Sequence, residues 1–277
     1  MAGFIELVSG QERQALSFLD SDPVRNLRMI WALRRWGIFD IGLPEQGRYL
    51  AYSEGGKIKG LLLFNNLGLW RLAAHGAAAR GLAAEALSSW GAPEMLAGTE
   101  EEVEALLQGV AGLAYVVEHK EKEMSLLLSP EDFHPIEGEA ALATEDDLDD
   151  LVDLERELQL ELLGSCAAAW VIRSQMRMAM EEGAAALVRW EDDAVAKAAM
   201  EAVTPKVDEL GGVFTRTDYR LRGFASATCT LVCASSLAKG KKVRLETQRD
   251  NQAALRFYRR LGFRELWPHL VIRFGAA

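Results

Sequence analysis

The sequence predicts an α/β protein in two halves, each a mixed, mostly antiparallel twisted sheet flanked by helices. The 277 residues exceed the roughly 150 of a typical domain, so two cores are expected. Helical and strand periodicities alternate along both halves, and a stretch with two prolines and a glycine, 129–138, lies between them. With 49% hydrophobic and 26% charged residues, the composition is that of an ordinary globular chain and excludes disorder, collagen and a disulfide scaffold.

The first half begins with a predicted helix. Asp22-Pro23 is typical of an N-cap followed by proline at the first helical position, and Gly37 offers a stop. Short antiparallel strands joined by tight turns are then expected, followed by two helices and one long or two short strands. The expected strands are 49–52, 57–64 and 70–74, the helices 77–90 and 100–110, and the last strand segment 114–128.

The second half opens with a capping-box pattern at Thr144–Asp147, which predicts a helix over 148–162. A second helix is expected through 170–180 to a stop at Gly183. Three antiparallel strands follow, and then helix, strand, helix and strand. Their expected ranges are 184–190, 194–203, 207–215, 223–237, 243–248, 252–261 and 266–274.

The net charge of −10 conceals an asymmetry along the chain. Residues 206–264 hold thirteen Lys and Arg against five Asp and Glu, so the remainder is strongly acidic. A positive segment in an acidic protein suggests a local anionic ligand more than a nucleic-acid track. A solvated basic face without a ligand is the alternative.

Several classes of protein are excluded by what the sequence lacks. No apolar run reaches the length of about 18 residues that a membrane helix needs. The first residues have neither the basic nor the apolar region of a signal peptide, so we expect a cytoplasmic location. Neither the three cysteines nor the four histidines show zinc-binding spacings, and we assign no metal.

The strongest motif runs from Gly211 to Ala225. A predicted strand leads into a loop with Arg220 and Arg222, and Gly223 stands where a helix begins. Helix N-termini present unpaired N–H groups and partial positive charge, which favours phosphate. The motif therefore predicts a pyrophosphate cradle. Gly211-Gly212 within a strand indicates a bulge, or a place where another backbone or a ligand lies alongside.

The run Arg220-Leu-Arg-Gly-Phe-Ala225, followed by Asn251, Ala254, Tyr258 and Leu261-Gly-Phe263, closely resembles the GNAT superfamily of acyl-CoA-dependent N-acyltransferases. The resemblance covers about residues 140–277. The first half is similar, more loosely, to the degenerate GNAT-like domain of tandem members. The resemblance implies two GNAT-like domains joined by a linker at 131–139. The domain at 1–130 is degenerate and non-catalytic, and the domain at 140–277 is the catalytic acetyltransferase domain.

The resemblance also implies that acetyl-CoA is bound. The backbone of Val213, Phe214 and Thr215 would pair with the pantetheine arm, where the third strand separates from the strand at Val243. The amides of the loop and helix start would hold the pyrophosphate: Arg220, Leu221, Arg222, Gly223, Phe224, Ala225 and Ser226. Lys239, Lys241 and Lys242 either meet the 3′-phosphate or only solvate a loop. Leu221 stands where the family often has glycine, which stiffens the loop or makes one amide less available.

The chemistry requires a base, because an amine with a pKa near 10.4 is almost fully protonated at pH 7. Glu209 is the first candidate, since several family members carry a glutamate at this spacing before the loop. It is otherwise an exposed strand residue or the partner of an arginine, and Glu201 and Glu246 are reserves. The amide of Val213 or Phe214 would stabilise the oxyanion.

Two residues of the last helix complete the site that the resemblance implies. Tyr258 would protonate the leaving thiolate, or otherwise only pack the helix onto the sheet. Asn251 is first a helix cap and second a hydrogen-bonding group for the cofactor.

These features predict an N-acetyltransferase that moves an acetyl group from acetyl-CoA to a primary amine by direct transfer through a tetrahedral intermediate. The acidic remainder of the chain favours a cationic small-molecule or protein amine as acceptor. No nucleic-acid or membrane partner is expected, and a homodimer is left open. The alternative is a catalytically silent acyl-CoA-binding sensor. A dinucleotide-binding protein fits poorly, because the G-x-G-x-x-G motif is missing.

Overall fold

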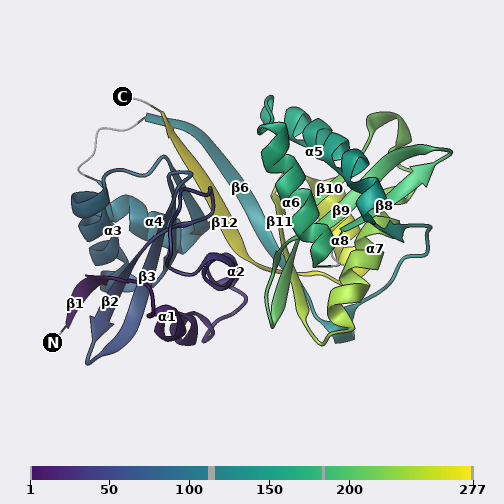
Figure 1. Cartoon of the computed structure of the whole chain (residues 1–277). Coiled ribbons are helices and arrows are strands. Elements are labelled where there is room, and N and C mark those ends of the chain that lie inside the picture. Colours follow the sequence, from purple (N-terminus) through teal and green to yellow (C-terminus); the bar gives the residue numbers. More distant parts are fainter. Residues whose placement is uncertain (1, 112–115, 183–184, 276–277) are drawn as a thin grey trace. The chain divides into compact units, whose positions relative to one another are not determined.

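The computed structural model describes residues 2–111, 116–182 and 185–275, and the chain divides into two compact units (Figure 1). Unit 1 comprises Met1–Ser125, Thr247–Asp250 and Leu266–Ala277, and unit 2 comprises Leu126–Glu246 and Asn251–Glu265. The C-terminal residues from Leu266 onward thus group with unit 1, although we expected them in the second domain. The domain ranges 1–130 and 140–277 stay a prediction.

Unit 1 has an antiparallel meander followed by a parallel strand pair. Its strands run in the order β1-β2-β3-β4-β5-β12, and only β4 and β5 among the pairs between β1 and β12 are parallel in the described part. The elements are β1 (Ala2–Glu6), α1 (Glu12–Leu19), α2 (Leu27–Trp36), β2 (Gly47–Glu54), β3 (Lys57–Asn65), β4 (Leu69–Ala73), α3 (Gly76–Trp90), β5 (Met95–Thr99) and α4 (Glu100–Gly109). β6 (Val116–Leu128) and β12 (Arg264–Gly275) contain residues of both units.

The main core of unit 1 forms because alternate strand residues and one face of each of two helices are apolar. Leu62 and Trp70 of the meander are fully buried with Leu82 of α3 and Leu106 of α4. The predicted meander and both predicted helices are therefore confirmed.

Three local predictions in unit 1 were wrong or incomplete. The helix expected after Pro23 begins only at Leu27, with Asn26 at the N-cap position. Asp22 caps a separate turn instead, because its Oδ1 accepts a hydrogen bond from the Arg25 amide at 3.1 Å. The elements β1, α1 and β5 were not predicted from the sequence. The predicted strand start at Ala114 lies outside the described residues, and a single strand runs from Val116.

Unit 2 follows the predicted order of helices and strands. Its elements are β7 (Ala141–Leu142), α5 (Leu148–Leu163), α6 (Ala169–Glu181), β8 (Ala185–Trp190), β9 (Asp193–Val203), β10 (Val207–Thr215), α7 (Phe224–Leu237), β11 (Lys242–Gln248) and α8 (Gln252–Leu261). Its strands are ordered β11-β10-β9-β8-β7. The last two residues of β11, Thr247 and Gln248, group with unit 1. The short β7 is the addition to the prediction, and the expected boundaries at Gly183 and Ala184 lie outside the described residues.

Helices cover both faces of the unit 2 sheet (Figure 1). Neighbouring strand residues point to opposite faces. Leu187 of β8 accordingly packs with Leu151 of α5 and Ile172 of α6, whereas the adjacent Val188 packs with Ala227 of α7. Unit 2 thus has three layers, in which the sheet lies between α5 and α6 on one face and α7 on the other. Within the sheet, β9 and β10 are inner strands. None of the described helices has the length and hydropathy that crossing a membrane requires.

Candidate functional site

Strands β10 and β11 pair only over their first residues and then separate. The parallel register joins Val207 to Lys242, Asp208 to Val243 and Glu209 to Arg244. β10 continues to Thr215, and within the described part of both strands no further register pair joins them. The predicted separation of these strands is therefore present, and it begins directly after Glu209.

A β-bulge lies in β10 just beyond this point. Gly211 pairs with Ala199 of β9 and Phe214 pairs with Lys197, so β10 uses one more residue than β9 over this interval. Gly212 adopts φ +54°, the left-handed region that favours glycine. A Cβ on Gly211 would lie 2.2 Å from Oε1 of Glu201, so a larger residue at 211 would displace the Glu201 side chain. The bulge expected from Gly211-Gly212 is confirmed.

The loop after β10 leads to a helix N-terminus without a side-chain cap. Gly223 is the N-cap residue of α7, with φ +86°. A Cβ built on it would meet nothing within 4 Å apart from its chain neighbours, so the space at the Cβ position of Gly223 is open. These N–H groups have no partner within the helix, and the helix dipole adds positive potential. The arrangement suits a phosphate group.

Leu221 departs from the usual backbone of its residue type. It adopts φ +63° and its side chain is fully exposed. This conformation costs a non-glycine residue about 1–2 kcal/mol. Leucine at a position where glycine is common in the family thus occupies a strained conformation, and the stiffer loop or less available amide stays a prediction.

The arginines of the loop are held by groups of unit 2 itself. The Nη2 atom of Arg220 lies 2.7 and 2.6 Å from the two carboxylate oxygens of Glu161, and Nε donates to the Thr215 carbonyl at 2.9 Å. The Arg222 guanidinium lies over the rings of Trp190 and Tyr219, 5.3 and 5.4 Å from their centroids. Arg220 is thus paired within unit 2, whereas Arg222 lies against aromatic rings.

Other cations of the positive segment are also paired. Arg216 donates to Glu157, and Nζ of Lys241 lies 2.9 Å from Oδ1 of the buried Asp208. Several cations of the segment are therefore engaged by carboxylates of the protein itself. Of the lysines considered for a 3′-phosphate, Lys241 serves this ion pair.

Two of the predicted cofactor residues have informative surroundings. The Oγ1 atom of Thr215 is buried and has no hydrogen-bond partner among the described residues. A buried hydroxyl without a partner is costly, so a ligand that bonds to it would be favoured. Phe214, by contrast, packs with Leu154 of α5, so its side chain belongs to the core.

Asn251 is the N-cap of α8. Its side-chain oxygen accepts a hydrogen bond from the Ala254 amide at 3.0 Å. The predicted capping role is confirmed, and the proposed contact with a cofactor stays a prediction.

Glu209 lies in a buried ion pair. Its side chain is 3% exposed, and its Oε1 is 2.6 Å from Nη2 of Arg244. The same Nη2 is 3.2 Å from Oε1 of Glu246, whose side chain is 17% exposed. Of the two alternatives to a catalytic role, the structure shows the partnership with an arginine. The three charged residues lie where β10 and β11 separate, and the role of Glu209 as base stays a prediction.

Tyr258 is buried on α8. Its ring centroid lies 4.8 Å from that of Phe257 and 5.6 Å from that of Phe263. Burial raises the pKa of its phenol well above the usual value, and the nearby thiols of Cys229 and Cys233 raise it further. The predicted packing role is thus present. As a donor, Tyr258 would be a phenol that holds its proton more tightly than usual.

Two partners of the site, Lys197 and Arg244, were not predicted from the sequence. Lys197 has no exposed side-chain surface, and it lies in a strand of alanines and valine. A lysine with small apolar neighbours on both sides indicates a buried ammonium, which needs a counter-ion. That pattern was the available signal for Lys197.

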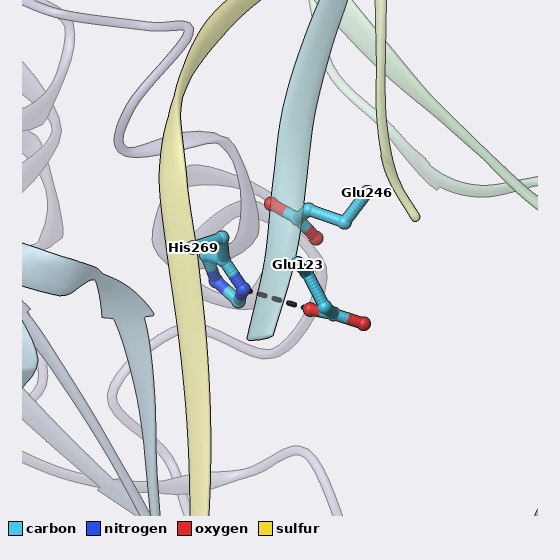
Figure 2. A group of neighbouring side chains, drawn as sticks. All are labelled: Glu123, Glu246 and His269. Atoms are coloured by element: carbon cyan, nitrogen blue, oxygen red, sulfur yellow. Dashed lines mark hydrogen bonds and ion pairs between the residues drawn. The ribbon is translucent and has the colours of Figure 1, made fainter. Parts of the chain in front are cut away.

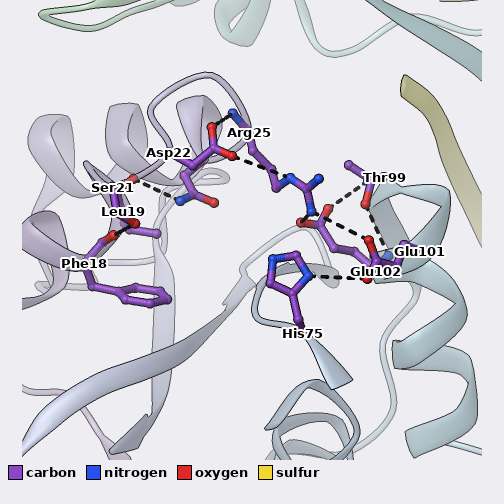
Figure 3. Close-up of polar contacts among 10 residues, drawn as sticks. Phe18, Leu19, Ser21, Asp22, Arg25, His75, Thr99, Glu101 and Glu102 are labelled. Atoms are coloured by element: carbon purple, nitrogen blue, oxygen red, sulfur yellow. Dashed lines mark hydrogen bonds and ion pairs between the residues drawn. The ribbon is translucent and has the colours of Figure 1, made fainter. Parts of the chain in front are cut away.

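In the described part of unit 1, the corresponding connection from strand to helix is much shorter. Only Ala74 and His75 connect β4 to α3, whereas residues 216–223 connect β10 to α7. Carboxylates lie nearby instead: Nδ1 of His75 is 3.4 Å from Glu101, and Arg25 is 3.7 Å from the buried Glu102 (Figure 3). These carboxylates disfavour an anion at the start of α3.

The buried His269 of unit 1 has a hydrogen-bond partner within the same unit. Nδ1 of His269 on β12 lies 2.8 Å from Oε2 of Glu123 on β6 (Figure 2). His269 is thus satisfied by a protein group.

Comparison with known proteins places these features in a family. Residues 150–263 match the model of the acetyltransferase (GNAT) family. A GNAT-family acetyltransferase from Colwellia psychrerythraea has a TM-score of 0.64 at 12% identity, covering 99% of this chain and 100% of that chain. A GCN5-related N-acetyltransferase from Sphaerobacter thermophilus has a TM-score of 0.62 at 16% identity, covering 98% and 95%.

A tandem GNAT protein from the clavulanic acid biosynthesis pathway has a TM-score of 0.61 at 14% identity, and the similarity covers 100% of both chains. At such low identities these structures show a shared fold and give no substrate. No curated protein sequence matches the chain.

The bulged strand, its separation from β11 and the uncapped start of α7 together define an α/β domain that can hold an extended anionic ligand. The family match gives this class its name: the chain contains a domain of the GNAT acetyltransferase family.

Proposed function

We propose that unit 2 binds acetyl-CoA and transfers its acetyl group directly to a primary amine. The observation that carries this proposal is the open, uncapped N-terminus of α7, which the chain reaches from a bulged strand that has separated from its neighbour. A phosphate-binding helix start next to an unpaired strand edge fits a ligand that has a pyrophosphate at one end and an amide-containing arm at the other.

The described residues fit such a ligand. The amides of Phe224, Ala225 and Ser226 would hold the pyrophosphate, because no side chain caps them and the space at Gly223 is open. The buried hydroxyl of Thr215 would gain a hydrogen-bond partner. Acetyl-CoA supplies a thioester, whose thiolate leaves readily because thiols of this kind have a pKa near 8.5.

A carboxylate of the Glu209–Arg244–Glu246 cluster would accept the proton of the incoming ammonium. Glu209 remains our first candidate because it is the last paired residue before the strands separate. Its burial means that the proton would reach it through water, whereas Glu246 is the more exposed carboxylate of the two. Comparing turnover of Glu209→Gln and Glu246→Gln across pH shows which of the two carboxylates is the base, because only its loss should remove the dependence of turnover on that group.

Tyr258 would act as a hydrogen-bond donor to the leaving thiolate. Its raised pKa keeps the phenol protonated throughout the neutral range. Full transfer of that proton to a thiolate of lower pKa is uphill, so the contribution is stabilisation of the developing charge.

The acceptor is the least specified part of the reaction. The acidic surplus outside 206–264 favours a cationic amine. A panel of polyamines, amino acids, amino sugars and lysine peptides would be screened for acetyl-CoA-dependent thiol release, with mass measurement of the product. A product carrying one added acetyl group supports the proposal. The cationic acceptor and the cytoplasmic location stay predictions. A homodimer stays open.

The alternative, a silent acyl-CoA sensor, is favoured by one observation: Glu209 is engaged with Arg244 and almost fully buried. The enzyme predicts that Glu209→Gln and Tyr258→Phe lower turnover with little loss of CoA affinity. The sensor predicts CoA binding without thiol release for any amine. Failure of the wild-type protein to bind CoA would reject both functions.

A further inference from the structure

Lys197 on β9 is a fully buried cation next to the bulge of β10. Its Nζ atom lies 2.7 Å from Oε2 of Glu155 on α5. Nζ also donates a hydrogen bond to the Gly212 carbonyl oxygen at 2.7 Å. A buried ammonium is tolerated only when it is paired and hydrogen-bonded, and here one of its partners is the backbone of the bulge itself.

Glu155 is in turn held in place. Its Oε1 accepts a hydrogen bond from Nε2 of Gln159 at 2.8 Å, one turn along α5. The chain of contacts thus runs from α5 through Glu155 and Lys197 to the bulge.

The ammonium also accounts for the glycine at the centre of the bulge. A Cβ on Gly212 would lie 2.7 Å from Nζ of Lys197, and the backbone there has φ +54°. Glycine at 212 therefore lets the ammonium reach the carbonyl oxygen and relieves the strain of a left-handed conformation.

The position of this carbonyl determines the direction of the next amide. The carbonyl of Gly212 and the N–H of Val213 belong to one peptide group, and no described peptide bond is cis. In a trans peptide the C=O and N–H bonds point in opposite directions. Because the carbonyl points to Lys197, the N–H of Val213 points away from it. Neither Gly212 nor Val213 has a register partner on β9 in the described sheet.

We propose that Lys197, held by Glu155, is a positioning residue that fixes the bulge so that the Val213 N–H bonds to the thioester carbonyl of bound acetyl-CoA. The inference rests on the proposed function and deepens it, because it names the side chains that orient the oxyanion-binding amide. Lys197 itself touches neither the cofactor nor the acceptor in this account.

The test compares the affinities of acetyl-CoA and CoA by calorimetry, since CoA lacks the carbonyl. Wild-type protein is expected to bind acetyl-CoA about fivefold more tightly than CoA, the effect of one hydrogen bond. In Lys197→Met the CoA affinity is unchanged and the preference for acetyl-CoA disappears. With the best acceptor, kcat falls about 10²-fold while its KM changes little, as for the loss of one oxyanion donor.

Two further variants separate positioning from folding. Lys206→Met removes an exposed lysine of the same unit and should keep both the acetyl-CoA preference and kcat. The double variant Lys197→Met/Glu155→Gln leaves no unpaired buried charge. It is expected to fold and bind CoA like the wild type but to lack the acetyl-CoA preference, and it replaces the single variant if that one does not fold.

The outcomes are distinct. Equal affinity of wild-type protein for CoA and acetyl-CoA, or a preserved preference in the folded Lys197 variants, overturns the positioning role and leaves the proposed function standing. Absence of CoA binding by the wild type overturns the proposed function, and the inference with it.

Discussion

Leu221 is a fully exposed side chain on a left-handed backbone, at φ +63°. The leucine side chain is not buried there to compensate for its strained backbone. Its presence in the loop before the α7 N-terminus therefore lowers stability for reasons that are local to one residue.

Replacing Leu221 with glycine is expected to raise the free energy of unfolding by about 1 kcal/mol. The relief of 1–2 kcal/mol of backbone strain exceeds the entropy that glycine adds to the unfolded state. Leu221→Ala is the matched control, because it removes the same exposed side chain but keeps the Cβ that causes the strain. Urea unfolding of the three proteins measures the difference, and equal midpoints for the glycine and alanine variants would contradict the explanation.

Tyr258 provides a second residue-scale prediction, on pH dependence. Burial raises its folded-state pKa, whereas an unfolded phenol titrates near 10. Its contribution to stability is complete below pH 10 and is lost as the pH rises toward the folded pKa, because the unfolded state releases its proton first. Between pH 8 and pH 10.5 the wild type should lose about 1 kcal/mol more stability than Tyr258→Phe.

Urea unfolding at the two pH values measures this loss, with Tyr219→Phe, a less buried tyrosine, as the control. An equal loss in wild type and Tyr258→Phe would mean that the phenol titrates normally in the folded protein.

Among the elements, helix α8 depends on its first residue. Asn251 caps the helix through Ala254, and an N-cap contributes about 1 kcal/mol. Asn251→Ala should lower the free energy of unfolding by about that amount, and Asn251→Asp should restore it, because aspartate also accepts the amide hydrogen bond. If alanine destabilises no more than aspartate, the cap is not what orders this end of α8.

Element order in unit 2 was predictable because its signals are local. Gly240 and Gly262 follow their helices, Asn251 precedes one, and alternating or continuous apolar runs mark the strands. The start of α2 was not predictable in this way, because Asp22-Pro23 has the residues of a helix start but caps a single turn. β5 was missed because five residues with a glycine carry little periodicity, and its identity as a strand depends on pairing with β4 and β12.

The candidate site was predictable in its backbone and less so in its charges. Gly212 and Gly223 adopt positive φ and Gly211 leaves room for Glu201, so these glycines allowed the bulge and the helix start to be located from the sequence. The partners of Glu209, Arg220 and Lys197 lie far away in the sequence, and only the fold brings them together. For that reason the composition of 206–264 overstated the free positive charge at the loop.

For the whole molecule, the two units share an order of elements but differ in the connection that matters for an anion. Antiparallel strands, a helix, a parallel strand and a second helix follow one another in both units. The connection from β4 to α3 is two residues long and has Glu101 nearby, whereas residues 216–223 connect β10 to α7 and include a 3-10 turn at Thr217–Tyr219. The shared order agrees with the similarity to a tandem GNAT protein over the full length.

This difference predicts that each chain binds one CoA rather than two. Calorimetric titration of the full chain gives the stoichiometry directly. A value near two sites per chain would show that unit 1 also holds a nucleotide and that the short connection before α3 does not prevent it.

In the proposed function the start of α7 holds the pyrophosphate of CoA, and titration of two glycine variants with CoA tests this placement. Gly223 and Gly240 both have positive φ and open space at the Cβ position, but they lie before and after the same helix. Gly223→Glu places a carboxylate at the anion site, whereas Gly240→Glu adds the same charge and strain at the far end. Calorimetry is expected to show CoA binding abolished in Gly223→Glu and kept in Gly240→Glu. Unchanged CoA affinity in Gly223→Glu would contradict the account.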